Sequence, residues 1–243
     1  MNKKDGDAIA IGGDYQYRAL TEGYSVQRFW HRAKLLAIRK FLPPRAQDRV
    51  LDIGCGSGVV SGFLGESGAH VVGLDTSAEA IRFATARYGS EQVKFVRARV
   101  DEAPPVERPV DKIYCLELLE HIHRPQAERM LDFFRDTLTN DGKVFLTTPN
   151  VHSAWPAIEW LLDHSGLVPV MAGHQHVEMY HPAKMAALCV ERGFRVSVLT
   201  TMCTFSPWLA PISQRVAERV FQKETEIPFC LGPVLVVVLE KKG

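Results

Sequence analysis

The chain has 243 residues, of which 46% are hydrophobic, and a formal net charge of +1 at pH 7. A chain of this length can build one large domain with a substantial core, and a second full domain is not expected. The near-neutral charge argues against a dedicated nucleic-acid binder, which usually carries a larger basic excess.

Targeting and cysteine patterns indicate the compartment. No apolar run of about 18 residues is present, and the N-terminus lacks the apolar stretch of a secretory signal. The five cysteines are scattered without C-x-x-C spacing, which argues against a disulfide framework or a cysteine-rich zinc site. We therefore expect a soluble, cytoplasmic protein with reduced cysteines.

The first predicted element is an N-terminal helix. Residues 27–42 have helical apolar spacing, and the stretch extended to Arg45 carries six basic residues and no acidic one. Residues 1–44 are interpreted as a helical lid over a ligand site, with the ligand-binding domain at 45–243. A helix with a solvated basic face that packs on the sheet is the favoured plainer alternative, and contact with anionic lipid or phosphate is also compatible with these charges.

A glycine-rich loop follows the first predicted strand. Residues 50–53 form a short apolar run typical of a buried parallel strand. Gly54, Gly56 and Gly58 come next at alternate positions, where the lack of side chains lets the backbone turn sharply and lets a ligand approach it. Residues 59–64 then continue as a helix whose N-terminal amides face the turn.

The second predicted strand, residues 71–74, ends at Asp75. A carboxylate at that position suits the two hydroxyls of a ribose, so the pattern predicts a nucleotide-type cofactor site. The dinucleotide fingerprint Gly-x-Gly-x-x-Gly is not met, because Val59 stands where the third glycine is required. This disfavours a nicotinamide cofactor.

Apolar strand-like runs alternate with amphipathic stretches through the rest of the chain. The remaining predicted strands are residues 93–96, 113–116, 143–147, 194–198 and 233–239. Helices are predicted over residues 80–88, 183–192 and 212–222, the first of them after Thr76 and Glu79 at capping-box spacing. The predicted fold class is α/β, a Rossmann-like seven-stranded, mainly parallel sheet with helices on both faces.

The glycine loop with Asp52 before it and Asp75 after it resembles motif I and the following acidic residue of class I S-adenosylmethionine-dependent methyltransferases. The resemblance covers about residues 45–150. It implies that the loop backbone holds the methionine moiety of the cofactor and that Asp75 binds the ribose. Cys55 is expected to be a small residue packed under the cofactor. The cofactor-binding residues implied in this way are Asp52, Gly54, Cys55, Gly56, Gly58, Asp75, Thr76, Val100, Asp101 and Leu116.

The third strand departs from the family pattern, which has Gly-Asp-Ala where this chain has Ala98, Arg99 and Val100. A guanidinium has no acceptor, so Arg99 cannot accept a hydrogen bond from the adenine amino group. Two alternatives are open for adenine. Either Asp101 or Glu102 accepts that bond, or backbone amides and Val100 hold the ring.

A second group of polar residues follows the fourth predicted strand, at the carboxyl edge where ligands bind. Glu117, Glu120 and His121 are spaced so that a helical turn would place them on one face. A histidine-rich loop at 173–182 adds His176 as a further candidate.

This pattern is similar to that of two methyltransferase families, the ubiquinone-pathway O-methyltransferases and the small-RNA 3′-terminal 2′-O-methyltransferases. In the RNA family the matching residues bind a divalent metal, which implies a site of Glu117, Glu120, His121 and His176 for Mg²⁺, Mn²⁺, Fe²⁺ or Zn²⁺. Metal-free methyltransferases with Glu-His at this position give an equally weighted alternative. In that case His121 or His176 is the general base, with Glu120 beside it.

Acceptor identity must come from segments outside the cofactor core. Insertions at about 151–180 and 204–229 are rich in large apolar residues and are interpreted as walls of an acceptor pocket, with core or dimer contacts as an equal alternative.

Three functions are compatible with these patterns. The first is O-methylation of a small, partly apolar hydroxyl acceptor, with or without a metal. The second is RNA 3′-terminal 2′-O-methylation, and the third is S-adenosylmethionine binding without catalysis. The sequence does not predict the oligomeric state.

Overall fold

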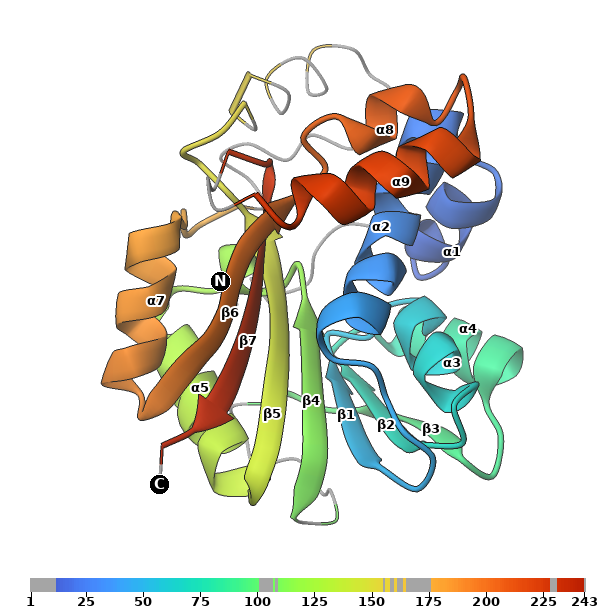
Figure 1. Cartoon of the computed structure of the whole chain (residues 1–243). Helices are drawn as coiled ribbons and strands as arrows, with labels where there is room; N and C mark the ends of the chain where they lie inside the picture. Colours follow the sequence, from blue (N-terminus) through green and yellow to red (C-terminus); the bar gives the residue numbers. More distant parts are fainter. Residues whose placement is uncertain are drawn as a thin grey trace, which may run out of the picture.

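The computed structural model describes residues 12–100, 107, 109–154, 156–157, 160, 164, 176–227 and 231–242. Within these residues seven strands form one sheet in the order β3-β2-β1-β4-β5-β7-β6 (Figure 1). The strands are β1 (Arg49–Ile53), β2 (His70–Asp75), β3 (Val93–Arg97), β4 (Val110–Leu116), β5 (Leu138–Pro149), β6 (Phe194–Met202) and β7 (Val234–Lys241). Only β7 runs antiparallel to its neighbours, β5 and β6. The predicted fold and its seven strands are confirmed.

The register of the central strands places the candidate site residues at one edge of the sheet. Ile53 at the end of β1 pairs with Leu74 of β2 and with Cys115 of β4. The three strands therefore end at the same level. The loop after β1, the carboxylate that ends β2 and the polar residues after β4 are neighbours for that reason.

Helices cover both faces of the sheet (Figure 1). The helices are α1 (Tyr15–Thr21), α2 (Ser25–Phe41), α3 (Val59–Gly65), α4 (Ala78–Tyr88), α5 (Arg124–Thr137), α7 (Pro182–Glu191), α8 (Ser206–Leu209) and α9 (Gln214–Glu224). One core cluster joins α5 and α7 to one side of the sheet, and a second joins α2, α3 and α9 to the other. The sheet is thus buried on both faces, which explains why its central strands are mainly apolar.

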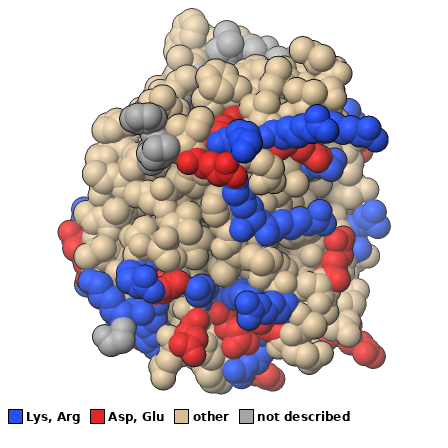
Figure 2. All heavy atoms as spheres, in the orientation of Figure 1, with Lys and Arg blue, Asp and Glu red and all other residues tan. Residues whose placement is uncertain are grey.

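The helices α1, α2, α8 and α9 pack together beyond the carboxyl edge of the sheet (Figure 1). Arg32 of α2 forms an ion pair with Glu218 of α9 at 2.6 Å. Lys40 Nζ donates to the backbone carbonyl of Gln222 at 2.8 Å. Lys and Arg side chains gather over this part of the surface (Figure 2). Segments from both ends of the chain therefore form one helical layer beyond this edge of the sheet.

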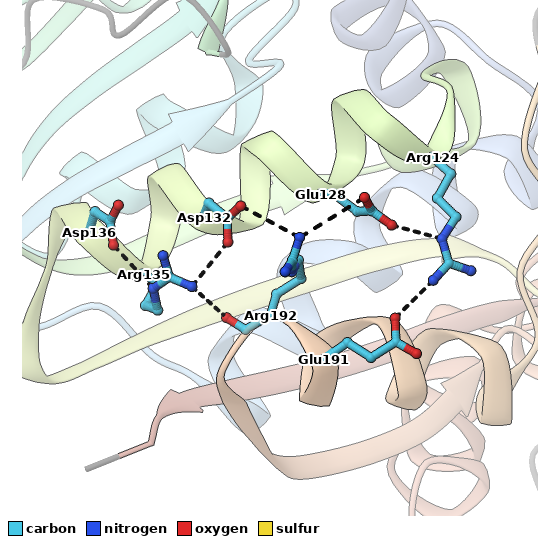
Figure 3. Close-up of polar contacts among 7 residues, drawn as sticks. All are labelled: Arg124, Glu128, Asp132, Arg135, Asp136, Glu191 and Arg192. Atoms are coloured by element: carbon cyan, nitrogen blue, oxygen red, sulfur yellow. Dashed lines mark hydrogen bonds and ion pairs between the residues drawn. The ribbon is translucent and has the colours of Figure 1, made fainter.

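On the face of the sheet that α5 and α7 cover, ion pairs link α5 to α7 and to Arg192, the residue that follows α7 (Figure 3). The partners are Arg124, Glu128, Asp132, Arg135, Asp136, Glu191 and Arg192. Arg124, for example, contacts Glu128 within α5 and Glu191 of α7, each at 2.8 Å. Such partly exposed pairs contribute at most about 1 kcal/mol each, so burial under α5 supplies most of the stabilisation there.

Three local features differ from the sequence interpretation or were missed by it. The N-cap of α4 is Ser77, whose hydroxyl accepts from the Ala80 N–H at 3.2 Å, so the predicted capping box with Thr76 is wrong. Helices α1, α5 and α8 were not predicted. Most of the 151–180 insertion lies outside the described residues, as do Asp101 and Glu102. Among the described residues, no helix has the length and apolarity needed to span a bilayer.

Candidate active site

The glycine loop after β1 depends on left-handed backbone geometry. Gly54, Gly56 and Gly58 have φ values of 72°, 50° and 78°. A Cβ added to Gly58 would lie 2.8 Å from the Cβ of Ala84, and one added to Gly56 would lie 2.7 Å from Oε1 of Gln16. Both the dihedral angle and the packing therefore require glycine at these positions. The three glycines leave their part of the loop backbone without side chains that would hinder a ligand.

Asp75, at the end of β2, lies directly against this loop. Its Oδ2 accepts from the Gly56 N–H at 2.9 Å, and its Oδ1 accepts from the Ser77 N–H at 2.8 Å. The side chain is half-buried, so a polar ligand can still reach the carboxylate. This is the position that a ribose-binding acid needs.

Asp52 lies beneath the loop. It is 2% exposed, and its Oδ2 accepts a 2.6 Å hydrogen bond from the Ser61 hydroxyl. Burial, with a smaller contribution from the charge of Asp75, raises the pKa of this carboxyl to about 7. Asp52 thus fixes the loop to α3, and its buried side chain is not exposed to a ligand. Cys55 is also buried, and burial raises the pKa of its thiol well above the ordinary value, as expected for a packed, unreactive residue.

The other implied cofactor residues occupy different environments. Leu116 is buried at the end of β4, and Val100 is half-buried against the core. Thr76 is exposed, and its carbonyl accepts from Arg97 Nε at 2.9 Å. Asp101 lies outside the described residues.

Helix α1 lies over the glycine loop. The Tyr17 N–H donates to the Ser57 hydroxyl at 3.1 Å, and the amide of Gln16 lies against Gly56. Tyr17 also contacts the ring of Phe83 on α4, with centroids 5.5 Å apart. The N-terminal segment therefore covers the side of the loop that faces away from the sheet.

A carboxylate and two imidazoles come together beyond β4. Ligand atoms of Glu120, His121 and His176 all lie within 4.8 Å of one another, the one such group of three or more found among the described residues. The two imidazole centroids are 5.0 Å apart. The Thr148 hydroxyl donates to Glu120 Oε2 at 3.0 Å and orients the carboxyl group.

Backbone hydrogen bonds explain how His176 reaches the other two residues from a distant part of the sequence. Glu120 and His121 belong to a short 3₁₀ turn, η2 (Leu119–His121). The Glu120 carbonyl accepts from the N–H groups of Val177 and Glu178 at 2.8 and 3.1 Å. The segment that carries His176 is therefore fastened to η2.

Burial is the main influence on the charge of this cluster. It raises the pKa of Glu120 to about 8, and the nearby charge of Glu117 adds to the rise, while His176 opposes it. A cation held by the cluster would favour the ionised carboxylate. The charge state of Glu120 therefore depends on what the cluster binds.

Glu117, the fourth expected ligand, lies outside this group. Its φ is 53°, so the helical turn expected through Glu117 is not formed. Its Oε1 accepts from the Thr147 hydroxyl at 3.1 Å, and its Oε2 forms an ion pair with Lys34 Nζ at 3.2 Å. The structure thus brings together three of the four expected ligands and directs the fourth to a lysine of α2.

Lys34 was missed as a site residue. The Lys34 side chain is only 12% exposed. Its charge acts on His31 of the same helix and on Cys203, so the side chain lies on the side of α2 that faces the end of β6. Lys34 is one of several basic residues of α2, and the sequence does not distinguish it from the others. Nothing in the sequence indicated that its partner is 83 positions away, from 34 to 117.

The fold and these residues define an α/β enzyme with a nucleotide-type cofactor site next to a carboxylate–imidazole cluster. Residues 26–198 match the family model described as "Methyltransferase domain". Over 174 residues the chain is 32% identical to the ubiquinone biosynthesis O-methyltransferase of Xylella fastidiosa (strain 9a5c), a match that covers 68% of each protein.

Solved structures show the same fold. The S-adenosylmethionine dependent methyltransferase of Mesorhizobium loti has a TM-score of 0.64 at 18% identity, covering 86% of this chain and 98% of that one. The magnesium protoporphyrin IX methyltransferase of Synechocystis PCC 6803, with bound SAH, has a TM-score of 0.62 at 15% identity, covering 95% and 94%. The chain belongs to the class I S-adenosylmethionine-dependent methyltransferases.

Proposed function

We propose that this methyltransferase transfers the methyl group of S-adenosylmethionine to a hydroxyl oxygen of a small, partly apolar acceptor. The observation that carries the proposal is the position of the Glu120, His121 and His176 cluster. It follows β4 at the edge where the glycine loop follows β1, and β1 and β4 are adjacent strands. The relatives named as ubiquinone biosynthesis O-methyltransferases support oxygen as the acceptor atom.

The cofactor is assigned to the glycine loop and Asp75. Backbone amides of the loop would hold the methionine part, and Asp75 would accept from the ribose hydroxyls in place of its present bond to the Gly56 N–H. Residues 1–44 would act as a lid, because α1 already contacts the loop through Gln16 and Tyr17.

The chemistry needed from the protein is modest. A sulfonium methyl is already activated, so the enzyme must align the acceptor oxygen with the methyl–sulfur bond and remove the hydroxyl proton. His121 or His176 would accept that proton, and the Thr148-oriented carboxyl of Glu120 would hold the imidazoles in position. No covalent enzyme intermediate is required.

The same three side chains fit a divalent cation. One carboxylate oxygen and two imidazole nitrogens within 4.8 Å of one another form a mixed donor set that suits Mn²⁺, Fe²⁺ or Zn²⁺ better than Mg²⁺, which prefers oxygen ligands. Bound there, a cation would lower the pKa of a coordinated acceptor hydroxyl. Glu120, His121 and His176 would hold it, and Glu117 would remain with Lys34.

The acceptor pocket is proposed to lie between the cluster and the insertions at 151–180 and 204–229. The charges of Glu117 and Lys34 both act on Cys203, the residue just before the second insertion. The start of that insertion is therefore close to the site. Its apolar side chains would contact the body of the acceptor. RNA is the less favoured acceptor, because Glu117 does not join the other three residues and the net charge is only +1.

Transfer of isotopically labelled methyl from S-adenosylmethionine into a cell extract tests the proposal. The extract is separated into organic-soluble and RNA fractions, with and without a chelator, and His121→Ala is run beside the wild type. We expect label in the organic fraction that the variant does not produce. If the chelator abolishes labelling, the cluster acts through a bound cation. If labelling persists with chelator, an imidazole of the cluster accepts the hydroxyl proton of the acceptor.

Two results would contradict the proposal. Label confined to RNA would assign the cluster to 2′-O-methylation. No label in either fraction from protein that binds S-adenosylmethionine would instead favour a role in cofactor binding without catalysis.

A further inference from the structure

Two histidines outside the cluster stack on each other at the two ends of the 151–180 insertion. The ring centroids of His152 and His181 are 4.2 Å apart, and the angle between the ring planes is 8°. His152 lies just inside the start of the insertion, and His181 is the residue directly after its end. The stacked pair therefore joins the two ends of the insertion at its base.

Backbone contacts beside the stack close the same base. Asn150 and Tyr180 form an isolated parallel bridge, and the Val151 N–H donates to the Tyr180 carbonyl at 3.0 Å. The His152 N–H donates to Asn150 Oδ1 at 3.1 Å. His176 lies in the segment that leads into this base, so closure of the base limits how far His176 can move from the rest of the cluster.

His181 also caps α7. It is the N-cap residue of the helix, and its Nδ1 accepts from the Lys184 N–H at 3.4 Å. An imidazole nitrogen accepts a hydrogen bond only while it carries no proton, so this cap requires a neutral ring. A protonated His181 would lose the bond and would place a positive charge at a helix N-terminus, where the helix dipole disfavours it.

The surroundings of the pair also favour neutral rings. Burial lowers the pKa of His181 below its ordinary value of 6.5, and the charges of His152 and Lys184 add to this effect. The ammonium of Lys184 pairs with the Glu178 carboxylate and donates to the Met179 carbonyl at 2.7 Å. In the part of the chain that the structure describes, no carboxylate forms an ion pair with either ring of the stack.

We propose that the stack of His152 and His181 is a pH-sensitive clasp that positions His176: it is closed while both rings are neutral, and acid opens it. The closed state is then most stable above pH 6.5, the ordinary pKa of histidine. As the pH falls below that value, the ratio of open to closed clasp rises by up to about 10-fold for each pH unit and ring. The effect on methyl transfer rests on the proposed function, but the clasp itself does not.

Amide hydrogen exchange of the full chain, followed by NMR, tests the clasp without any methyl transfer. Exchange is measured about one pH unit above and about one below 6.5, and each rate is corrected for the intrinsic effect of pH. The Val151, Val177 and Lys184 amides report on the base, on the segment of His176 and on the cap, because they donate to Tyr180, Glu120 and His181. We expect their protection to fall by up to about 10-fold at the lower pH.

His181→Asn separates the clasp from the other titrating groups. Asparagine is a good N-cap and does not titrate, so protection in this variant should be equal at the two pH values. His152→Phe keeps an aromatic ring but removes one charge, so it should lose less protection than the wild type. His70→Asn is the matched control, because His70 is exposed at the start of β2, at the opposite end of the sheet, and contacts only Gln47 at 3.2 Å. It should lose protection as the wild type does.

Protection in the wild type that does not change with pH, or an equal loss in His181→Asn, would overturn the proposal. The pH profile of kcat/KM reports separately on the cluster. As the pH falls, kcat/KM should decrease less in His181→Asn than in the wild type, and identical profiles would show that the pair does not position His176. A clasp that opens with acid in a chain without methyl transfer would support the clasp and contradict the proposed function.

Discussion

At the scale of single residues, Asp52 links the cofactor loop to the pH dependence of stability. Burial raises its pKa from 3.8 to about 7, so the folded chain retains a proton that the unfolded chain releases. The free energy of unfolding should therefore fall as the pH rises from about 4 to about 7, by up to about 4 kcal/mol from this group. Above that range Asp52 contributes no further change.

Asp52→Asn removes this titration. In urea unfolding at a series of pH values, the stability of the variant relative to the wild type should increase as the pH rises through the same range. Asp111→Asn is a suitable control, since Asp111 is only half-buried and lies at the far end of the sheet beside Arg49. A parallel pH dependence in Asp52→Asn and the wild type would contradict the assignment.

Lys34 is the second informative residue. Its ion pair with Glu117 is largely buried, with side chains that are 12% and 20% exposed. Arg32, on the same helix as Lys34, pairs with Glu218 of α9, and those side chains are 50% and 34% exposed. Lys34→Met should lower the free energy of unfolding by about 2 kcal/mol, and Arg32→Met by less than about 1 kcal/mol.

Thermal melts of the two variants measure that difference. The rate of methyl transfer should differ further between the two variants, because Lys34→Met leaves the Glu117 carboxylate beside the cluster without its cationic partner. We expect a lower kcat/KM for the acceptor and an unchanged Kd for S-adenosylmethionine. Equal effects of the two substitutions would show that Lys34 has only a surface role.

The sequence predicted the residues whose roles follow from backbone geometry. Gly54, Gly56, Gly58 and Asp75 could be placed because a loop between a strand and a helix requires them in order along the chain. The contact of Glu117 with Lys34 could not, because it depends on how α2 packs across the sheet and on a left-handed backbone conformation at Glu117. Tertiary packing decides such conformations.

At the scale of elements, α8 is held by one buried side chain. Glu224 of α9 accepts four hydrogen bonds from residues 203–206. Glu224→Ala would leave those donors buried without their partner, so the free energy of unfolding should fall by about 3 kcal/mol. Amide hydrogen exchange should increase first across α8.

Glu226→Ala is the control for this prediction. Glu226 lies two positions away, is 56% exposed and pairs with Lys40 at 3.2 Å, so its removal should cost less than about 1 kcal/mol. Destabilisation of similar size in both variants would mean that the carboxylate of Glu224 is not the support of α8.

Element prediction succeeded where one strong pattern dominated. Continuous apolar runs were found, namely β7 and the 113–116 part of β4. Helices α2, α3, α4, α7 and α9 were predicted to within two residues at each end. Helix α5 was missed although Ala127, Met130, Leu131 and Phe134 have helical spacing and charged residues fill its exposed side, a pattern that indicates an amphipathic helix. Helix α1 is short, and it is stabilised by contact with the glycine loop, which sequence periodicity does not record.

At the scale of the whole molecule, three structural features lie at the carboxyl edge of the sheet. The glycine loop and Asp75 lie after β1 and β2, the carboxylate–imidazole cluster lies after β4, and α1 of the helical layer contacts the glycine loop. Parallel strands that end at one level make this arrangement possible. The fold was predicted from the sequence, and the resemblance also predicted the convergence of His176 on Glu120 and His121. The sequence did not reveal the backbone bonds that fasten residues 176–178 to η2 and so produce this convergence.

The most direct test of the central claim is single-turnover transfer of labelled methyl at saturating S-adenosylmethionine, with the cofactor Kd measured for the same proteins. His121→Ala should bind the cofactor as the wild type does and transfer the methyl at least about 100-fold more slowly, the contribution typical of a positioned base. Asp75→Ala should lose cofactor affinity instead. Transfer by His121→Ala at the wild-type rate would contradict the assignment of the cluster as the methyl-transfer site.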